Sequence, residues 1–504
     1  MHRCGAGNRH GAGKSLATRI LNTHKLSIVY PSWANASPGT TGALLTSANA
    51  DILSGKTNRS ARALKKVGLF SFVFVMYSYT TAGPFGLEDM VRTSGPGMAL
   101  IYQLVIPFFW CIPISLVAAE LTTAMPVEGG FYRWTRAAFG DFWGFLAGWW
   151  NWCASFLLGA LYAVLFTDYL SFYFPALTGW KHFAVAVLVI AVISYINVRG
   201  IRLVGRVVTV MELAILAVVL VMCLMSVRMW HHNPFSPVIP PHTPLFPVFG
   251  VGFALGLWLY AGYEQVSSVA EEVEDPQRSY PRALAWVVPL SMATYLLPTA
   301  CALAALGDWQ KWGTGYFSQA ATLIGGPALG FVITAAAGVM NLSILNSAML
   351  TTTRMPSAMA QDGYLSPQLA RIHPKFGTPW ISILLSGLIY CLLAGLRVTE
   401  LIPVYIWLRV ATSVLTVLSA WRLRKTRPDL PRAFRIPCKG AGLAYSVIAP
   451  LIISAVALIV PMFSNAEGDR FSSRWGPVAL LLGPLAYLLF RRKKESQLIQ
   501  SRTL

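Results

Sequence analysis

Residues 79–89 read Tyr-Thr-Thr-Ala-Gly-Pro-Phe-Gly-Leu-Glu-Asp and lie inside the first long apolar segment of the sequence. Pro84 lacks an amide hydrogen and disfavours helical backbone at Gly83, so an unbroken membrane helix is not expected here. The pattern predicts two half-helices joined by an unwound segment, and the alternative is a simple proline kink. Because lipid cannot satisfy freed backbone groups, an unwound segment must face protein or a watery cavity, where a polar solute can bind.

A second apolar segment, residues 246–272, is interrupted near its middle by Gly262 and the ionisable Glu264. In the count of spans given below, the two interrupted segments are the first and the sixth. Interrupted helices in corresponding positions of two halves indicate the central site of a transporter.

The composition indicates a polytopic membrane protein. Of the 504 residues, 55% are hydrophobic and 12% are charged, and the mean hydropathy is +0.56. A membrane helix needs about 20 apolar residues. We expect twelve such spans, near residues 67–95, 98–122, 141–170, 181–198, 206–228, 246–272, 283–306, 327–352, 379–396, 400–422, 442–463 and 475–491.

The net charge of +20 reports topology rather than nucleic-acid binding. Most of the 40 Lys and Arg residues fall in the two terminal tails and in alternate loops between the predicted spans. This asymmetry is the positive-inside rule, and it predicts that both termini are cytoplasmic. We expect a plasma or bacterial inner membrane as the location, with membrane lipid as a partner of the basic tails.

Residues 1–66 are rich in Gly, Ser, Thr, Asn and Arg, with Asp51 as the only acid. They are predicted to form a disordered basic cytoplasmic tail; an organellar transit peptide and a misassigned start codon are alternatives. An intramembrane enzyme would need a nucleophile with its base, or a metal cluster such as HExxH, and the predicted spans contain neither. We therefore expect no enzyme activity, no cofactor and no metal.

Six ordered segments resemble the amino acid–polyamine–organocation transporter superfamily, over about residues 67–491. They are residues 83–86, 120–134, 197–200, 271–283, 358–363 and 427–437. Within the superfamily, residues 83–89 and 159–170 are similar to the polyamine-uptake branch and its bacterial relatives.

This resemblance implies an all-α membrane fold with twelve transmembrane helices. Its core would be two inverted five-helix repeats, spans 1–5 and 6–10, with discontinuous helices 1 and 6 and two accessory helices. The chain then divides into a tail (1–66), a transport core (67–422), a cytoplasmic loop (423–441), accessory helices (442–491) and a basic cytoplasmic tail (492–504).

The first break offers partial charges of both signs. Amides near Phe85 and Gly86 begin a half-helix and favour an anion, whereas carbonyls of residues 80–82 end the other half-helix and favour an ammonium group. An amino acid zwitterion fits that pair of ends. With the second break and span three, the predicted substrate-binding residues are Thr81, Ala82, Gly83, Pro84, Phe85, Gly86, Tyr260, Gly262, Tyr263, Glu264 and Tyr162. For Tyr162 the alternative is ordinary packing.

Two acids at membrane depth are candidates for coupling. Glu264 could bind a substrate amine or carry a proton, against the alternative of a structural hydrogen bond. Glu212 looks like a proton carrier or cation ligand by its place in the family's fifth helix, facing Ser343 or Asn346; the alternative is an acid at a helix end. Arg409 needs a partner that the spacing does not identify.

Glu88 is a third coupling candidate, and helix capping is its alternative. A diamine needs anionic partners at both ends, and span three carries no acid near residues 158–159.

The sequence thus predicts a secondary active transporter that imports amino acids, or polyamines, by alternating access with proton coupling. An exchanger, or a non-transporting nutrient sensor with the same pocket, is the alternative.

Overall fold

The computed structural model describes residues 68–81, 83–125, 129–199, 204–243, 248–267, 273–463 and 467–503, all within the unit Ala63–Leu504. The predicted tail 1–66 and the predicted site residue Ala82 lie outside the described residues. The element order is α3 (Leu69–Thr80), α4 (Glu88–Ser94), α5 (Pro96–Ile106), η2 (Pro107–Cys111), α6 (Ile112–Ala124), α7 (Gly130–Phe139), α8 (Asp141–Ser171), α9 (Trp180–Arg199), α10 (Val204–Val227), α12 (Val251–Leu259), α13 (Pro276–Leu306), η4 (Trp309–Lys311), α14 (Tyr316–Thr352), α15 (Arg354–Gln361), η5 (Pro367–Ala370), α16 (Trp380–Leu393), α17 (Val398–Thr426), α18 (Lys439–Ile459), η6 (Val460–Phe463) and α19 (Glu467–Thr503).

Nine helices in the described part of the chain are long and apolar enough to cross a membrane, so the protein is a multi-pass membrane protein. Two further apolar helices, α3 and α16, are shorter. The 12 residues of α3 rise only about 18 Å, well short of the roughly 30 Å of a bilayer core. That length fits a half-helix.

The first predicted span is broken. Helix α3 ends at Thr80 and α4 begins at Glu88, and the turn between them places Gly83 at φ +62° and Gly86 at φ +88°. These left-handed conformations explain why glycine stands at both positions. A proline kink in a continuous helix does not describe this segment.

The sixth predicted span is interrupted in the same manner. Helix α12 ends at Leu259, and residues 260–264 form no helix. Gly262 has a φ of +113°, which a residue with a side chain adopts only under strain.

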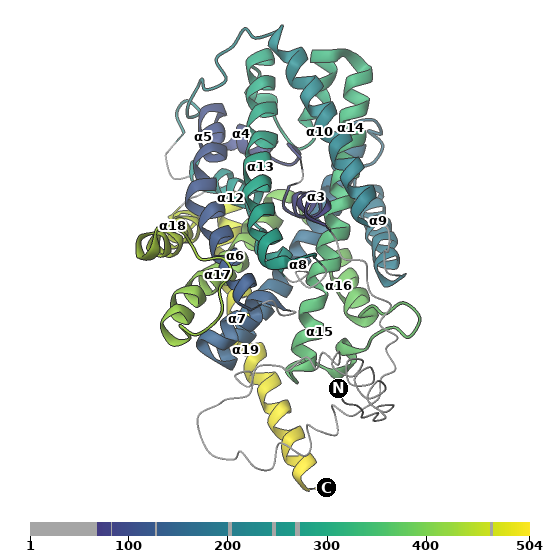
Figure 1. Cartoon of the computed structure of the whole chain (residues 1–504). Helices are drawn as coiled ribbons and strands as arrows, with labels where there is room; N and C mark the ends of the chain where they lie inside the picture. The colour runs from purple at the N-terminus through teal and green to yellow at the C-terminus, as the bar shows by residue number, and fades with distance from the viewer. Residues whose placement is uncertain are drawn as a thin grey trace, which may run out of the picture. The chain divides into compact units, whose positions relative to one another are not determined.

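Helices α8 and α17 pack against each other, and α8 lies near the middle of the helix arrangement (Figure 1). Helix α8 also packs on α14, and α3 packs against α13, α10 and α14. Helix α12 is buried along its length and packs against α4, α5 and α17. Both broken helices are therefore enclosed by other helices, where backbone groups freed from helical bonding find protein partners.

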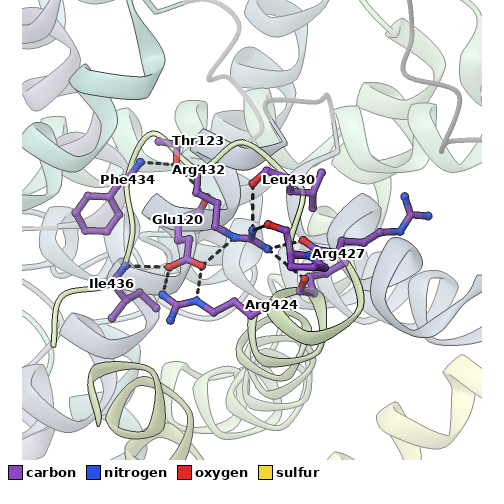
Figure 2. Close-up of polar contacts among 10 residues, drawn as sticks. Glu120, Thr123, Arg424, Arg427, Leu430, Arg432, Phe434 and Ile436 are labelled. Carbon is purple, nitrogen blue, oxygen red and sulfur yellow. Dashed lines mark hydrogen bonds and ion pairs between the residues drawn. The ribbon is translucent and has the colours of Figure 1, made fainter. Parts of the chain in front are cut away.

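A buried carboxylate joins α6 to the loop after α17 (Figure 2). Glu120 is fully buried; it accepts hydrogen bonds from both Arg424 Nε (2.7 Å) and Arg424 Nη2, and from the Ile436 amide (2.9 Å), while Arg432 Nε lies 3.3 Å away. Arg432 also donates to the carbonyls of Leu423 and Arg427, each at 3.1 Å, at the end of α17. We call this group the Glu120 clamp.

Candidate solute-binding site

Both interrupted segments border one small cavity. Its volume is about 20 Å³, room for about one water molecule. The lining residues come from α3, α8, α12, the second break, α13 and α17: Tyr79, Thr80, Leu158, Tyr162, Trp258, Leu259, Ala261, Gly262, Tyr295 and Tyr405. Aromatic rings dominate this lining, and none of the residues is charged.

Tyr295 on α13 joins the ends of the two broken helices. Its hydroxyl donates to the Leu259 carbonyl (3.0 Å) and lies 3.4 Å from the Thr80 carbonyl. These are the last residues of α12 and α3, whose carbonyls have lost their helical partners. The tyrosine hydroxyl thus occupies the carbonyls that an ammonium group would be expected to reach.

Glu88 is the first residue of α4, and its side chain bonds groups outside that helix rather than capping it. Its carboxylate accepts hydrogen bonds from the amides of Gly86 (2.8 Å) and Gly315 (3.2 Å) and from the Tyr169 hydroxyl. The neighbouring Phe85 ring packs edge-on against Tyr169 and Phe317. None of Phe85, Gly86 and Glu88 lines the small cavity.

Glu264 forms an ion pair with Arg409 of α17, and both side chains are only 2% exposed. Glu264 Oε1 also accepts from the Ser413 hydroxyl (3.0 Å), and Arg409 Nη1 donates to Asn151 Oδ1 (3.0 Å) on α8. Arg409 therefore finds its partner in the second break. The pair connects that break to α8 and α17, beside the cavity rather than in its lining.

Glu212 on α10 is fully buried, and neither of its carboxylate oxygens has a hydrogen-bond partner among the described residues. Ser78 lies beside it on α3 and hydrogen-bonds Ser343 of α14 (2.8 Å). Asn346 instead accepts from Asn197 of α9 (2.8 Å). Ser343 therefore lies close to Glu212 through its contact with Ser78, whereas the Asn346 side chain is hydrogen-bonded to α9.

The other predicted site residues fall into two groups. Tyr162 and Gly262 line the cavity, and the Tyr162 ring lies 6.0 Å from Trp258. Outside the lining, the Thr81 hydroxyl bonds Ser291 (2.6 Å) and the Tyr260 hydroxyl donates to the Gln103 carbonyl (2.7 Å). The remaining predicted residues outside the lining are buried: Gly83, Pro84 and Tyr263.

Sequence reasoning missed four aromatic residues of the lining: Tyr79, which begins the stretch quoted at the outset, Trp258, Tyr295 and Tyr405. Trp258 stands within one turn of the second break and could have been found from that position. Tyr295 and Tyr405 lie in long apolar helices whose sequences mark no particular face.

The family model for amino acid permeases matches residues 67–483. A probable polyamine transporter of Arabidopsis thaliana is 33% identical over 456 residues, 88% of this chain and 91% of that protein. The polyamine transporter RMV1 of Arabidopsis thaliana is 31% identical over 434 residues, 84% of this chain and 86% of that protein. An uncharacterized transporter of Mycobacterium tuberculosis is 29% identical over 338 residues, 66% of this chain and 74% of that protein.

The family description and the relatives' names all denote membrane transport proteins rather than enzymes. The matched region contains both interrupted helices and every lining residue of the cavity between them. The chain therefore belongs to the amino acid permease family, within the amino acid–polyamine–organocation superfamily.

Proposed function

We propose that this transporter imports amino acids by alternating access, driven by a proton gradient, and that polyamines are its second candidate substrate class. One observation carries the proposal: the two interrupted helices border a common cavity. A site between two broken helices allows one half of a transporter to move against the other around a fixed binding point.

The cavity must widen for a solute to enter. At about 20 Å³ it is smaller than any amino acid, so this conformation is closed around the site. Opening would release Tyr295 from the Thr80 and Leu259 carbonyls and leave those oxygens for a substrate ammonium. Binding energy that differs between the closed and open forms would then drive the exchange of conformations.

The chemistry of the lining suits a single ammonium group better than two. Tyrosine and tryptophan faces attract cations, and freed helix-end carbonyls add negative partial charge. Glu88 is held by Gly86, Gly315 and Tyr169, and Glu264 is held by Arg409. A diamine would have to displace one of these partners, which favours amino acids. The names of the plant relatives keep polyamines as the second candidate.

Glu212 is our first candidate for proton coupling. An ionised carboxylate is costly to bury without a donor, so a proton or a cation must accompany it. The Ser78–Ser343 pair beside it adds two hydroxyls that could share the proton or the cation, and Asn346 would act only after leaving Asn197. Glu264 and Glu88 remain secondary candidates, because each would have to exchange its present partners to carry a proton.

The proposed location is a plasma or bacterial inner membrane with both chain ends in the cytoplasm, as the charge distribution predicts. Anionic membrane lipid would bind the basic terminal tails and the basic cytoplasmic loops. An exchanger and a non-transporting sensor would use the same pocket, so flux has to be measured directly.

The test is uptake into liposomes that contain the purified full chain. Labelled arginine, a labelled mixture of neutral amino acids and labelled putrescine are each offered, with and without an inward proton gradient. Gradient-driven uptake of one class, reduced in Glu212→Gln, is the expected result. Binding of a solute by the folded protein without any uptake would overturn the transport proposal and favour a sensor.

A further inference from the structure

A second cavity, of about 750 Å³, lies at the ends of α4, α8 and α17 that the charge distribution predicts to be external. We call it the outer vestibule. Its ionisable lining residues are Asp89, Arg92, Asp168, His182 and Arg397. This cavity is large enough for an amino acid, unlike the cavity between the broken helices.

The vestibule lies in line with the central cavity. On α8, Tyr162 borders the central cavity and Asp168 borders the vestibule. On α17, Tyr405 borders the central cavity and Thr399 borders the vestibule. Six positions along a helix rise about 9 Å, so the two cavities follow one another along the same two helices. A solute on its way to the central cavity would meet the vestibule first.

The charges of the vestibule are partly compensated. Asp89 accepts hydrogen bonds from Arg92 (2.6 Å) and from the Thr314 hydroxyl (2.7 Å). The Asp89–Arg92 ion pair is neutral overall. Asp168 contacts His182 Nε2 at 2.8 Å.

Arg397 supplies the opposite charge. It precedes α17, and its backbone amide bonds Glu400 Oε2 (2.8 Å). Across the ranges that the structure describes, its guanidinium takes part in no ion pair. With the Asp89–Arg92 pair neutral, the remaining acid of the vestibule is Asp168, in contact with His182, and the remaining strong base is Arg397.

We infer that the outer vestibule is a docking site for a zwitterionic amino acid, with the ammonium at Asp168 and the carboxylate at Arg397. This inference rests on the proposed transport function, because it treats the vestibule as the entrance to the central cavity. A polyamine has no carboxylate for Arg397 and is repelled by its guanidinium. The vestibule therefore selects amino acids over polyamines before either reaches the central cavity.

The test uses the full chain with Asp168→Asn and Arg397→Gln, each alone. Asp308→Asn and Arg228→Gln are matched controls, because they make the same charge changes at exposed positions that do not line the vestibule. Uptake of the labelled neutral amino acid mixture is measured in liposomes. Equilibrium binding of the same mixture is measured in lipid nanodiscs, where no transport is needed.

Loss of one charge-assisted hydrogen bond should raise KM, and weaken binding, about tenfold in each vestibule variant. We expect kcat within about twofold of wild type and both controls unchanged. Values of KM and binding unchanged in both vestibule variants would overturn the inference. So would a gain in putrescine uptake on Asp168→Asn, or tighter amino acid binding on Arg397→Gln. If the wild type transports nothing, the transport proposal fails, and the nanodisc measurement still decides the docking site.

Discussion

Glu264 and Arg409, which are 145 positions apart in the sequence, form an ion pair in which each side chain is 2% exposed. The pair connects the unwound segment after α12 to the middle of α17, with Ser413 and Asn151 as further partners. Removing one member of a buried pair leaves the other charge uncompensated.

We therefore expect Glu264→Gln to lower the free energy of unfolding by about 3 kcal/mol. The double variant Glu264→Gln with Arg409→Gln should recover part of this loss, because it removes the stranded charge. Thermal unfolding in detergent measures both. Additive losses in the double variant would show that the two side chains do not interact energetically.

Glu212→Gln should abolish the effect of a proton gradient on uptake while leaving exchange of labelled for unlabelled solute intact. The substitution keeps the shape of the side chain and removes its ability to exchange a proton. Asp308→Asn, at an exposed carboxylate paired with Lys311, is the control. Gradient-driven uptake at the wild-type rate in Glu212→Gln would contradict a coupling role for this residue.

Gly86→Ala should reduce uptake at least about tenfold. A Cβ at this position would lie 2.9 Å from the Trp258 ring and would have to adopt φ +88°. Gly140 shares that φ but has nothing within 4 Å of its Cβ position, so Gly140→Ala isolates the backbone strain. We expect about 1 kcal/mol of destabilisation from strain alone. Equal loss of uptake in the two variants would show that contact with Trp258 is unimportant.

Tyr295→Phe should tighten substrate binding severalfold and lower thermal stability. Without its hydroxyl the closed form leaves two buried carbonyls unpaired, a cost of about 1–3 kcal/mol each, whereas a bound ammonium would satisfy them. Tyr260→Phe is the matched control, because that hydroxyl bonds the Gln103 carbonyl. KM values are compared in liposomes, and a weaker-binding Tyr295→Phe would argue against carbonyl recognition.

Glu120→Gln should destabilise the protein by about 2 kcal/mol through loss of the charged acceptor in the Glu120 clamp. Asp429→Asn, an exposed acid in the same loop, should have little effect. Chemical or thermal unfolding of the two variants makes the comparison. Similar stability in both would mean that the clamp contributes little.

Backbone chemistry in the sequence was enough to predict the broken helices. Pro84 cannot donate a helical hydrogen bond, and glycine is required where φ is positive, as at Gly86 and Gly262. These effects are local, so they can be inferred from a few neighbouring residues. The arrangement into two inverted repeats cannot be inferred from local rules; it was expected only from the family resemblance and stays a prediction.

The partners of the buried charges could not be predicted. Membrane helices are apolar on most faces, so hydrophobic periodicity does not reveal which side of α14 or α17 turns inward. We expected Asn346 near Glu212, but its side chain accepts a hydrogen bond from Asn197 instead. The partner of Arg409, which is Glu264, could not be assigned from the sequence for the same reason. Only packing decides these contacts.

The Glu120 clamp gives a physical reason for two of the segments that carry the family resemblance. Glu120 begins the first, and Arg432 and Ile436 belong to the second, more than 300 positions later. The two segments are halves of one contact between α6 and the loop after α17 (Figure 2). Because the two segments are so far apart in the sequence, their contact could not be inferred from the sequence alone.

The smallness of the central cavity also affects how affinity should be understood. A form with room for about one water cannot hold a solute in the central cavity, so only the fraction of molecules that is already open can bind there. The apparent dissociation constant is then the intrinsic constant divided by that open fraction. A variant far from the cavity that shifts the opening equilibrium will change measured affinity without touching the solute. Titrations across a set of variants will therefore measure how readily each one opens as much as how well it recognises its ligand.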